Sequence, residues 1–219
     1  MHPEKKPQGR PSKAKSSARD ELLLAARRCF AAKPYREVTT RMLANTAGVN
    51  AALIRYYFMN KEGLYRQMLS DVATEFQNTV AGFVSANPQN PVEAILRAHG
   101  ALILKNPDIP KLIFRELVFN EGAGRSLVIE NVAKPNKVFM MKLCAGLSSS
   151  GQFREDFNPA ILILSVLSVS IMPHLLKEVF EQLEGQTLDE TMLEQVIWQN
   201  AQMIQFGSLK EARNDDSSN

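Results

Sequence analysis

Apolar residues recur at helical spacing along almost the whole chain. In segment 18–32, Leu22, Ala26, Cys29 and Phe30 fall on one side of a helix whose other side is polar. Beyond Leu69 the same periodicity continues, and neither strand-like alternation nor an Asn-Gly hairpin signal interrupts it. The pattern therefore predicts an all-α fold, with an N-terminal three-helix domain followed by a helical bundle.

Helix-breaking residues set the expected bounds of the later helices. Asn-Pro pairs, glycine-rich turns and proline positions separate the apolar stripes from one another. The expected helices cover residues 60–86, 91–105, 109–120, 126–147, 159–183 and 188–206, with Pro135 interrupting or kinking the fourth of them.

Segment 39–61 predicts two short helices joined by a sharp turn. Thr39 can cap a helix that begins at Thr40, and Gly48 can adopt the positive φ that ends it. Asn50 can then cap a second helix over residues 51–57. This arrangement is a helix-turn-helix, whose second helix enters the major groove of DNA.

The same region resembles the N-terminal domain of TetR-type (tetracycline-repressor-like) bacterial transcriptional regulators, from about residue 19 to residue 69. The matching pairs and triplets, in family order, are Val38-Thr39, Ala47-Gly48-Val49, Tyr57-Phe58 and Lys61-Glu62. The chain departs from the family at Arg55, where a tyrosine is common. A guanidinium at this position can replace the phosphate contact of the phenol or reach a guanine edge.

The helix-turn-helix supplies the candidate DNA-binding residues. Asn50, Arg55 and Tyr56 are expected at base edges, with Ala51 beside them on the open side of the second helix. The expected phosphate contacts are Thr39, Thr40, Arg41, Tyr57 and Lys61, the last together with the N–H groups at the start of the following helix.

Charge is distributed unevenly between the two parts of the chain. Residues 1–66 hold fourteen Lys/Arg against five Asp/Glu, a balance of +9, whereas residues 67–219 have a balance of −6. A basic helix-turn-helix domain at 18–66 suits phosphate binding. Residues 1–17 and 210–219 are expected to be disordered, and Arg10, between Gly9 and Pro11, predicts either a minor-groove arm or a solubilising tail.

The run 160–172 is apolar almost all round and requires cover on more than one side. It is too short to span a bilayer, and no secretion signal precedes it. Together with the last helix it predicts either an intramolecular core or a two-fold four-helix interface, and the resemblance implies the latter. The candidate interface residues are Leu164, Leu167, Ser168, Ile197, Trp198 and Ala201.

The expected domain at 67–209 has the character of a ligand-binding bundle. His99, Phe114, Phe139 and His174 are the candidates for a cavity between helices, where bundles commonly bind small molecules. Residues of these types at such positions are more often plain core than ligand contacts. The surrounding Leu, Ile, Val, Phe and Met favour an apolar or amphipathic effector.

Motifs for catalysis and metal binding are missing from the sequence. It has no P-loop, GxGxxG or GxSxG, and its three histidines lie in no ligand-spaced cluster, so no enzyme activity, cofactor or metal is predicted. Cys29 and Cys144 suit reduced thiols of a cytoplasmic protein. The predicted function is a homodimeric repressor that binds a palindromic DNA operator and is released by a small-molecule effector. The alternative is a helical protein-interaction adaptor.

Overall fold

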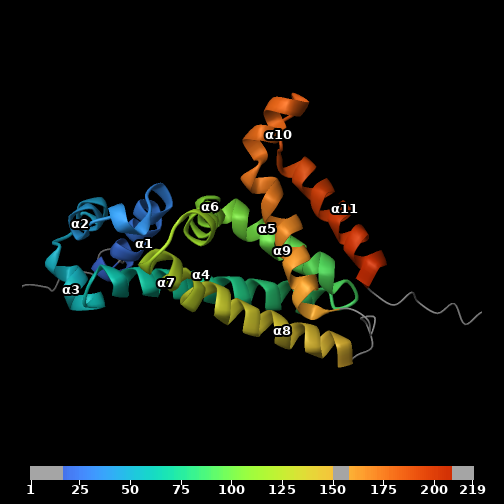
Figure 1. Ribbon diagram of the computed structural model, residues 1–219, viewed down its shortest axis with the longest axis horizontal. Coiled ribbons are helices and arrows are strands. Elements are labelled where there is room, and N and C mark those ends of the chain that lie inside the picture. Colours follow the sequence, from blue (N-terminus) through green and yellow to red (C-terminus); the bar gives the residue numbers. More distant parts are fainter. Residues whose placement is uncertain (1–16, 150–157, 209–219) are drawn as a thin grey trace, which may run out of the picture.

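The computed structural model describes residues 17–149 and 158–208, and the regular structure in these ranges is all helical (Figure 1). A head is formed by α1 (Ala18–Ala32), η1 (Tyr35–Glu37), α2 (Thr40–Ala47) and α3 (Ala52–Phe58). The C-terminal domain contains α5 (Pro91–Lys105), α6 (Asp108–Phe114), η2 (Arg115–Phe119), α7 (Ala123–Val128), η3 (Ile129–Ala133), α8 (Lys134–Ser149), α9 (Pro159–Leu175), α10 (Lys177–Glu184) and α11 (Glu190–Ser208). The long helix α4 (Lys61–Ala86) connects the two parts. The prediction of an all-α fold is confirmed.

Local capping interactions fix the helices of the head. Ser17 forms a capping box with Asp20 at the start of α1, and Thr39 Oγ1 accepts the N–H of Met42 at the start of α2. Gly48 ends α2 with a φ of 65°, which a residue without a Cβ adopts at no steric cost. The observed bounds of α1 to α5 therefore agree with the expected ones to within one residue.

A tight joint connects α3 to α4. Met59 has a φ of 67°, and Asn60 caps α4 by accepting the N–H of Gly63 at 2.8 Å. A Cβ on Gly63 would lie 1.9 Å from the carbonyl oxygen of Phe58. Gly63 is therefore required for the close approach that sets the angle between α3 and α4.

Two proline positions change the helices of the C-terminal domain. Before Pro135, the five-residue segment η3 has π-helical hydrogen bonding, with the N–H of Lys134 donated to Ile129 O. The expected helix 159–183 is in fact two helices, since α9 and α10 meet at Leu176 with a bend of 63°. Pro173 lacks an N–H for the carbonyl of Val169, and Asn200 Nδ2 of α11 donates to that oxygen instead, at 3.3 Å.

The apolar core consists of two clusters. One cluster contains the inner faces of α1 to α4 and also residues of the C-terminal domain, namely Leu112, Leu127, Val128 and Val132. The other lies among α4, α5, α8, α9 and α11. Because α4 contributes to both clusters, it connects the head mechanically to the helices that surround the second cluster. No single helix in the described ranges is long and apolar enough to cross a membrane, although the bent pair α9 and α10 passes that test jointly.

Candidate DNA interface and ligand cavity

Helix α3 has a buried apolar side and an open polar side. Ile54 and Phe58 pack into the core of the head, whereas Arg55 is exposed and Tyr56 is 78% exposed. Asn50 Oδ1 accepts the N–H of Ala52 at 2.8 Å, so the amide nitrogen of Asn50 keeps both of its donors. The expected base-contacting residues thus lie together on the exposed side of α3, with Ala51 at its start.

The start of α2 is a second exposed polar segment of the head. Thr39, Thr40 and Arg41 are exposed there, close to the free backbone N–H groups of the first helical turn. Within the described ranges neither Arg41 nor Arg55 forms an ion pair, so both guanidinium groups are available to phosphate or bases. The ring of Tyr57 packs edge-on against Tyr56, with 4.8 Å between centroids.

Lys61 occupies a position that the sequence did not indicate. Its Nζ donates to the carbonyl oxygens of Tyr35 and Val38, both at 2.9 Å, and lies over the ring of Tyr35. Burial lowers the pKa of this ammonium group. Lys61 therefore holds the turn that precedes α2, and the expected phosphate contact would depend on its remaining N–H. Arg10 lies outside the described residues.

An apolar cavity of about 340 Å³ lies in the C-terminal domain. Residues of α4, α5, α6, α8 and α9 and of both π-helical segments line it. Its polar lining residues are Glu75, His99, Asn106, Asn136 and Lys137. The predicted ligand residues divide into two pairs, since His99 and Phe114 line this cavity and Phe139 and His174 do not.

Neither Phe139 nor His174 faces the cavity, because each packs elsewhere. Phe139 is on α8 one residue before the lining residue Met140, so its ring points to a different side and meets Phe76 edge-on at 6.4 Å. His174 follows Pro173 near the end of α9 and borders a much smaller void of about 10 Å³ beside α11. The expectation for these two residues is corrected accordingly.

His99 is the most deeply buried polar group of the cavity wall, with 6% of its surface exposed. Its Nδ1 lies 3.1 Å from the carbonyl oxygen of Ile95, one turn earlier in α5, and the ring of Phe76 packs against it. Burial lowers the pKa of His99 from 6.5 to about 4, against the smaller opposing effect of the Ile95 hydrogen bond. The imidazole is therefore neutral at neutral pH.

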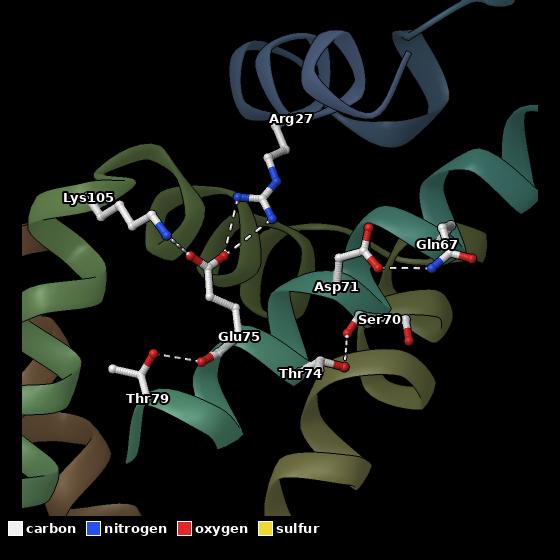
Figure 2. A network of polar contacts seen from close by, with 8 residues as sticks. All are labelled: Arg27, Gln67, Ser70, Asp71, Thr74, Glu75, Thr79 and Lys105. Atoms are coloured by element: carbon white, nitrogen blue, oxygen red, sulfur yellow. Dashed lines mark hydrogen bonds and ion pairs between the residues drawn. The ribbon is translucent and has the colours of Figure 1, made fainter. Parts of the chain in front are cut away.

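Glu75 connects the cavity wall to the head (Figure 2). Its Oε2 lies 3.3 Å from Arg27 of α1, and its Oε1 accepts from Lys105 of α5 at 2.6 Å. Burial by itself raises the pKa of this carboxyl, but the hydrogen bonds and charges of Lys105 and Arg27 outweigh it and lower the pKa overall. Glu75 is thus an ionised group shared by three helices.

A second connection joins segment η2 to the end of α1. Arg115 donates to the carbonyl oxygens of Phe30, Ala31 and Lys33, which are left without helical partners where α1 ends. Glu116, only 2% exposed, accepts the N–H of Tyr35 at 3.0 Å. Leu117 and Val118 of the same segment line the cavity. The cavity wall and the base of the head are therefore adjacent along one short stretch of chain.

Large apolar side chains are exposed on the last helices. Leu164 is 64% and Trp198 55% exposed, and Ser168 is also open. The exposed set further includes Ile161, Met172, Leu176, Val179, Leu183, Met203 and Phe206. Three of the predicted interface residues are not part of this exposed set. Ala201 is fully buried inside the subunit, which corrects its assignment, while Leu167 lines the cavity and Ile197 packs against Gly100 of α5.

Several structurally important residues were absent from the sequence predictions. Val72, Glu75 and Phe76 share one face of α4 at spacings of three and four residues, and this stripe is the signal that places Glu75 in the cavity wall. The contacts of Arg115 and Glu116 with the head have no such local signal. In the described ranges, no group of three or more His, Cys, Asp or Glu side chains is arranged to hold a metal ion.

A family model and two known proteins that match this sequence are all described as regulatory proteins. Residues 22–68 match the family model described as bacterial regulatory proteins, tetR family. The "Probable HTH-type transcriptional regulator YttP" of Bacillus subtilis is 23% identical over 74% of this chain and 79% of its own length. The HTH-type transcriptional repressor AcnR of Corynebacterium diphtheriae is 36% identical over 30% of this chain and 35% of its own.

Similarity of fold extends over both domains. The fatty acid degradation regulator FadR from Bacillus halodurans superposes with a TM-score of 0.67 at 16% sequence identity. The match covers 86% of this chain and 98% of that one, so the head and the C-terminal domain share one architecture with it.

Proposed function

We propose that the chain is a DNA-binding transcriptional regulator of the tetR family and that it acts as a homodimeric, ligand-responsive repressor. Each subunit supplies one head, and the two heads of a dimer bind the halves of a palindromic operator in successive major grooves, about 34–36 Å apart. A small apolar or amphipathic effector in the cavity releases the DNA. The protein would meet its operator in the cytoplasm.

The course of α4 is the observation that carries this proposal. The helix begins at the tight joint with α3, and its middle part contributes Val72, Glu75 and Phe76 to the cavity wall. A ligand that displaces this wall therefore moves the helix on which α3 is mounted. A difference in ligand affinity between the DNA-binding and the released arrangement is what shifts the population.

Glu75 and Arg115 support the same route. Arg27 and Lys105 meet at the carboxylate of Glu75, so a shift of α4 in the cavity changes a contact with α1 (Figure 2). Arg115 connects the cavity segment η2 to the end of α1, and Glu116 connects it to Tyr35. We expect both contacts to rearrange when a ligand binds.

The exposed apolar side chains of α9 to α11 support a dimer. Many large apolar side chains exposed on three consecutive helices are unfavourable in a monomer and suit a two-fold interface between copies of one chain. In the proposed dimer, Leu164, Ser168 and Trp198 face the partner. Ala201 belongs to the packing within each subunit.

Selection of bound duplexes from a random-sequence pool tests DNA recognition directly. We expect a two-fold symmetric consensus, and we expect Arg55→Ala to weaken binding to it by about 1–3 kcal/mol, the worth of a bidentate base contact. Lys142→Ala, which removes one exposed positive charge from α8, is the control and should leave binding unchanged. Equal weakening of operator and random DNA by Arg55→Ala would make Arg55 a phosphate contact. If the bound duplexes shared no consensus sequence, this result would contradict operator recognition.

A further inference from the structure

The unused nitrogen of His99 indicates what kind of molecule the cavity binds. Nδ1 faces Ile95 O, and because a carbonyl oxygen only accepts, Nδ1 must carry the hydrogen. The pKa of about 4 leaves the ring with a single hydrogen at neutral pH. Nε2, on the far side of the ring from the α5 backbone, is therefore an acceptor.

This acceptor has no partner among the described residues. His99 forms its one hydrogen bond through Nδ1, and its side chain lies in the wall of the large apolar cavity. Because the surrounding wall is mostly apolar, Nε2 gains a hydrogen bond only from a molecule that enters the cavity. A ligand with a donor would satisfy this acceptor, whereas a ligand without one would leave it unpaired.

The other polar groups of the wall do not require a charged ligand. The carboxylate of Glu75 is already paired with Arg27 and Lys105, so it has little remaining affinity for a cationic group. Asn136 Oδ1 accepts from Gln77 at 3.1 Å. Lys137 is exposed, so its charge is hydrated without a ligand. Nε2 of His99, in contrast, is a neutral acceptor that calls for a donor and not for a counter-charge.

We infer that the cavity takes a neutral, largely apolar molecule with one hydroxyl or N–H group, which donates its hydrogen to Nε2 of His99. This inference rests on the proposed function of the cavity and specifies the chemistry of the effector. The ring of Phe76, with its centroid 4.8 Å from that of the imidazole, holds the acceptor in one orientation. His99 thereby acts as the specificity-determining residue of the site.

Three probes with the same apolar body test the inference on the full-length protein. Para-hexylphenol has a donor, para-hexylanisole has the same oxygen without a hydrogen, and para-hexylbenzoate is an anion. Calorimetric titration at neutral pH should show the phenol binding at least about tenfold more tightly than the anisole. Apolar burial alone would give the opposite order, because the anisole is the more hydrophobic of the two.

The variant His99→Phe keeps an aromatic ring against Phe76 and removes the acceptor. It should bind phenol and anisole about equally, while the matched control His174→Phe, outside the cavity, should keep the preference of the wild type. Nitrogen NMR of the wild type provides a measurement that needs no variant. The Nε2 resonance of His99 should be that of an unprotonated nitrogen and should shift with the phenol but not with the anisole.

Each other outcome overturns the inference. Equal binding of phenol and anisole by the wild type would show that Nε2 selects nothing, although the cavity would still bind ligands. Tightest binding of the benzoate would identify an anion site, with Lys137 as its partner. A protonated Nε2 in the free protein would contradict the tautomer. Failure of all three probes to bind would count against the ligand-binding function itself as well.

Discussion

The head and the C-terminal domain are both helical, but different interactions fix their helices. In the head, the ends of α1 and α2 coincide with a capping box at Ser17, a cap at Thr39 and the left-handed turn at Gly48. In the C-terminal domain, helices depart from their local pattern at η2, at η3 and at the 63° bend of Leu176. Packing against other helices compensates for these departures.

This difference corresponds to the tasks of the two regions. In the proposed function the head has to present Arg55 and Tyr56 in one geometry, and local caps fix the ends of α1 and α2, which precede α3 in the chain. The C-terminal domain encloses a cavity and exposes an apolar surface, so it contains incompletely packed places where a ligand or a second subunit can bind. Helical segments with π hydrogen bonding are frequent at such functional sites.

The largest effect is expected at the apolar surface of the C-terminal domain. Leu164→Arg places an unpaired charge in the proposed dimer contact at a position that is open in the subunit, so the fold should persist while the dimer dissociates. Operator affinity should then fall about a thousandfold or more, toward that of non-specific binding.

Sedimentation and operator binding on the same sample measure this effect. Val138→Arg on α8 is the matched control, because Val138 is exposed to a similar degree on a different helix. A monomeric Leu164→Arg protein that holds the operator with the affinity of the wild type would refute the two-headed mechanism.

The next largest effect is a loss of stability in acid, which we expect from His99 in the buried cavity wall. Because the pKa of His99 is lowered from 6.5 to about 4, the unfolded chain takes up a proton between these pH values and the folded chain does not. The free energy of unfolding should therefore have its full value above about pH 6.5 and should decrease by roughly 3 kcal/mol as the pH falls toward 4.

Urea unfolding of the wild type and of His99→Phe at pH 7 and pH 4.5 measures this loss. The variant should lose less stability on acidification, whereas His174→Phe, at a half-buried position, should differ less from the wild type. An identical acid response of the wild type and His99→Phe would mean that His99 titrates normally.

A smaller effect tests the joint between the two regions. Gly63→Ala places a Cβ against the carbonyl of Phe58 and should destabilise the protein by about 1–3 kcal/mol, since backbone has to move. Gly82→Ala in the same helix meets no atom within 4 Å and should be neutral or stabilising by up to about 1 kcal/mol. Thermal unfolding of the pair measures the difference, and equal stabilities would refute the close approach.

The smallest effect concerns the connection through Glu75. Glu75→Gln removes the charge that attracts Arg27 and Lys105 but keeps the shape of the side chain (Figure 2). The loss of stability should be within about 1 kcal/mol, because these partly exposed pairs are screened by water. The ratio of operator affinity without para-hexylphenol to operator affinity with it should be smaller in this variant. An unchanged ratio would remove Glu75 from the coupling route.

The sequence by itself determined where the helices of the head begin and end. Its apolar stripes, the caps at Ser17 and Thr39 and the glycine at position 48 are interactions between residues a few positions apart, and the spacing along the chain shows them directly. The same spacing gave the all-α class and the exposed side of α3. Long-range contacts are the exceptions: the carbonyl partners of Lys61 at Tyr35 and Val38 lie more than twenty residues away, and Arg115 reaches the end of α1 from the C-terminal domain.

Tertiary structure alone decided the C-terminal sites. A stripe of apolar residues does not reveal which neighbour it meets, so Phe139, His174 and Ala201 were indistinguishable from His99, Phe114 and Leu164 in the sequence. The carbonyl of Val169, which Pro173 leaves without a helical donor, is served by Asn200 of α11, and the ionised state of Glu75 depended on Arg27 and Lys105 from two other helices. These contacts join residues that are far apart along the chain, and only the packing of the helices brings them together.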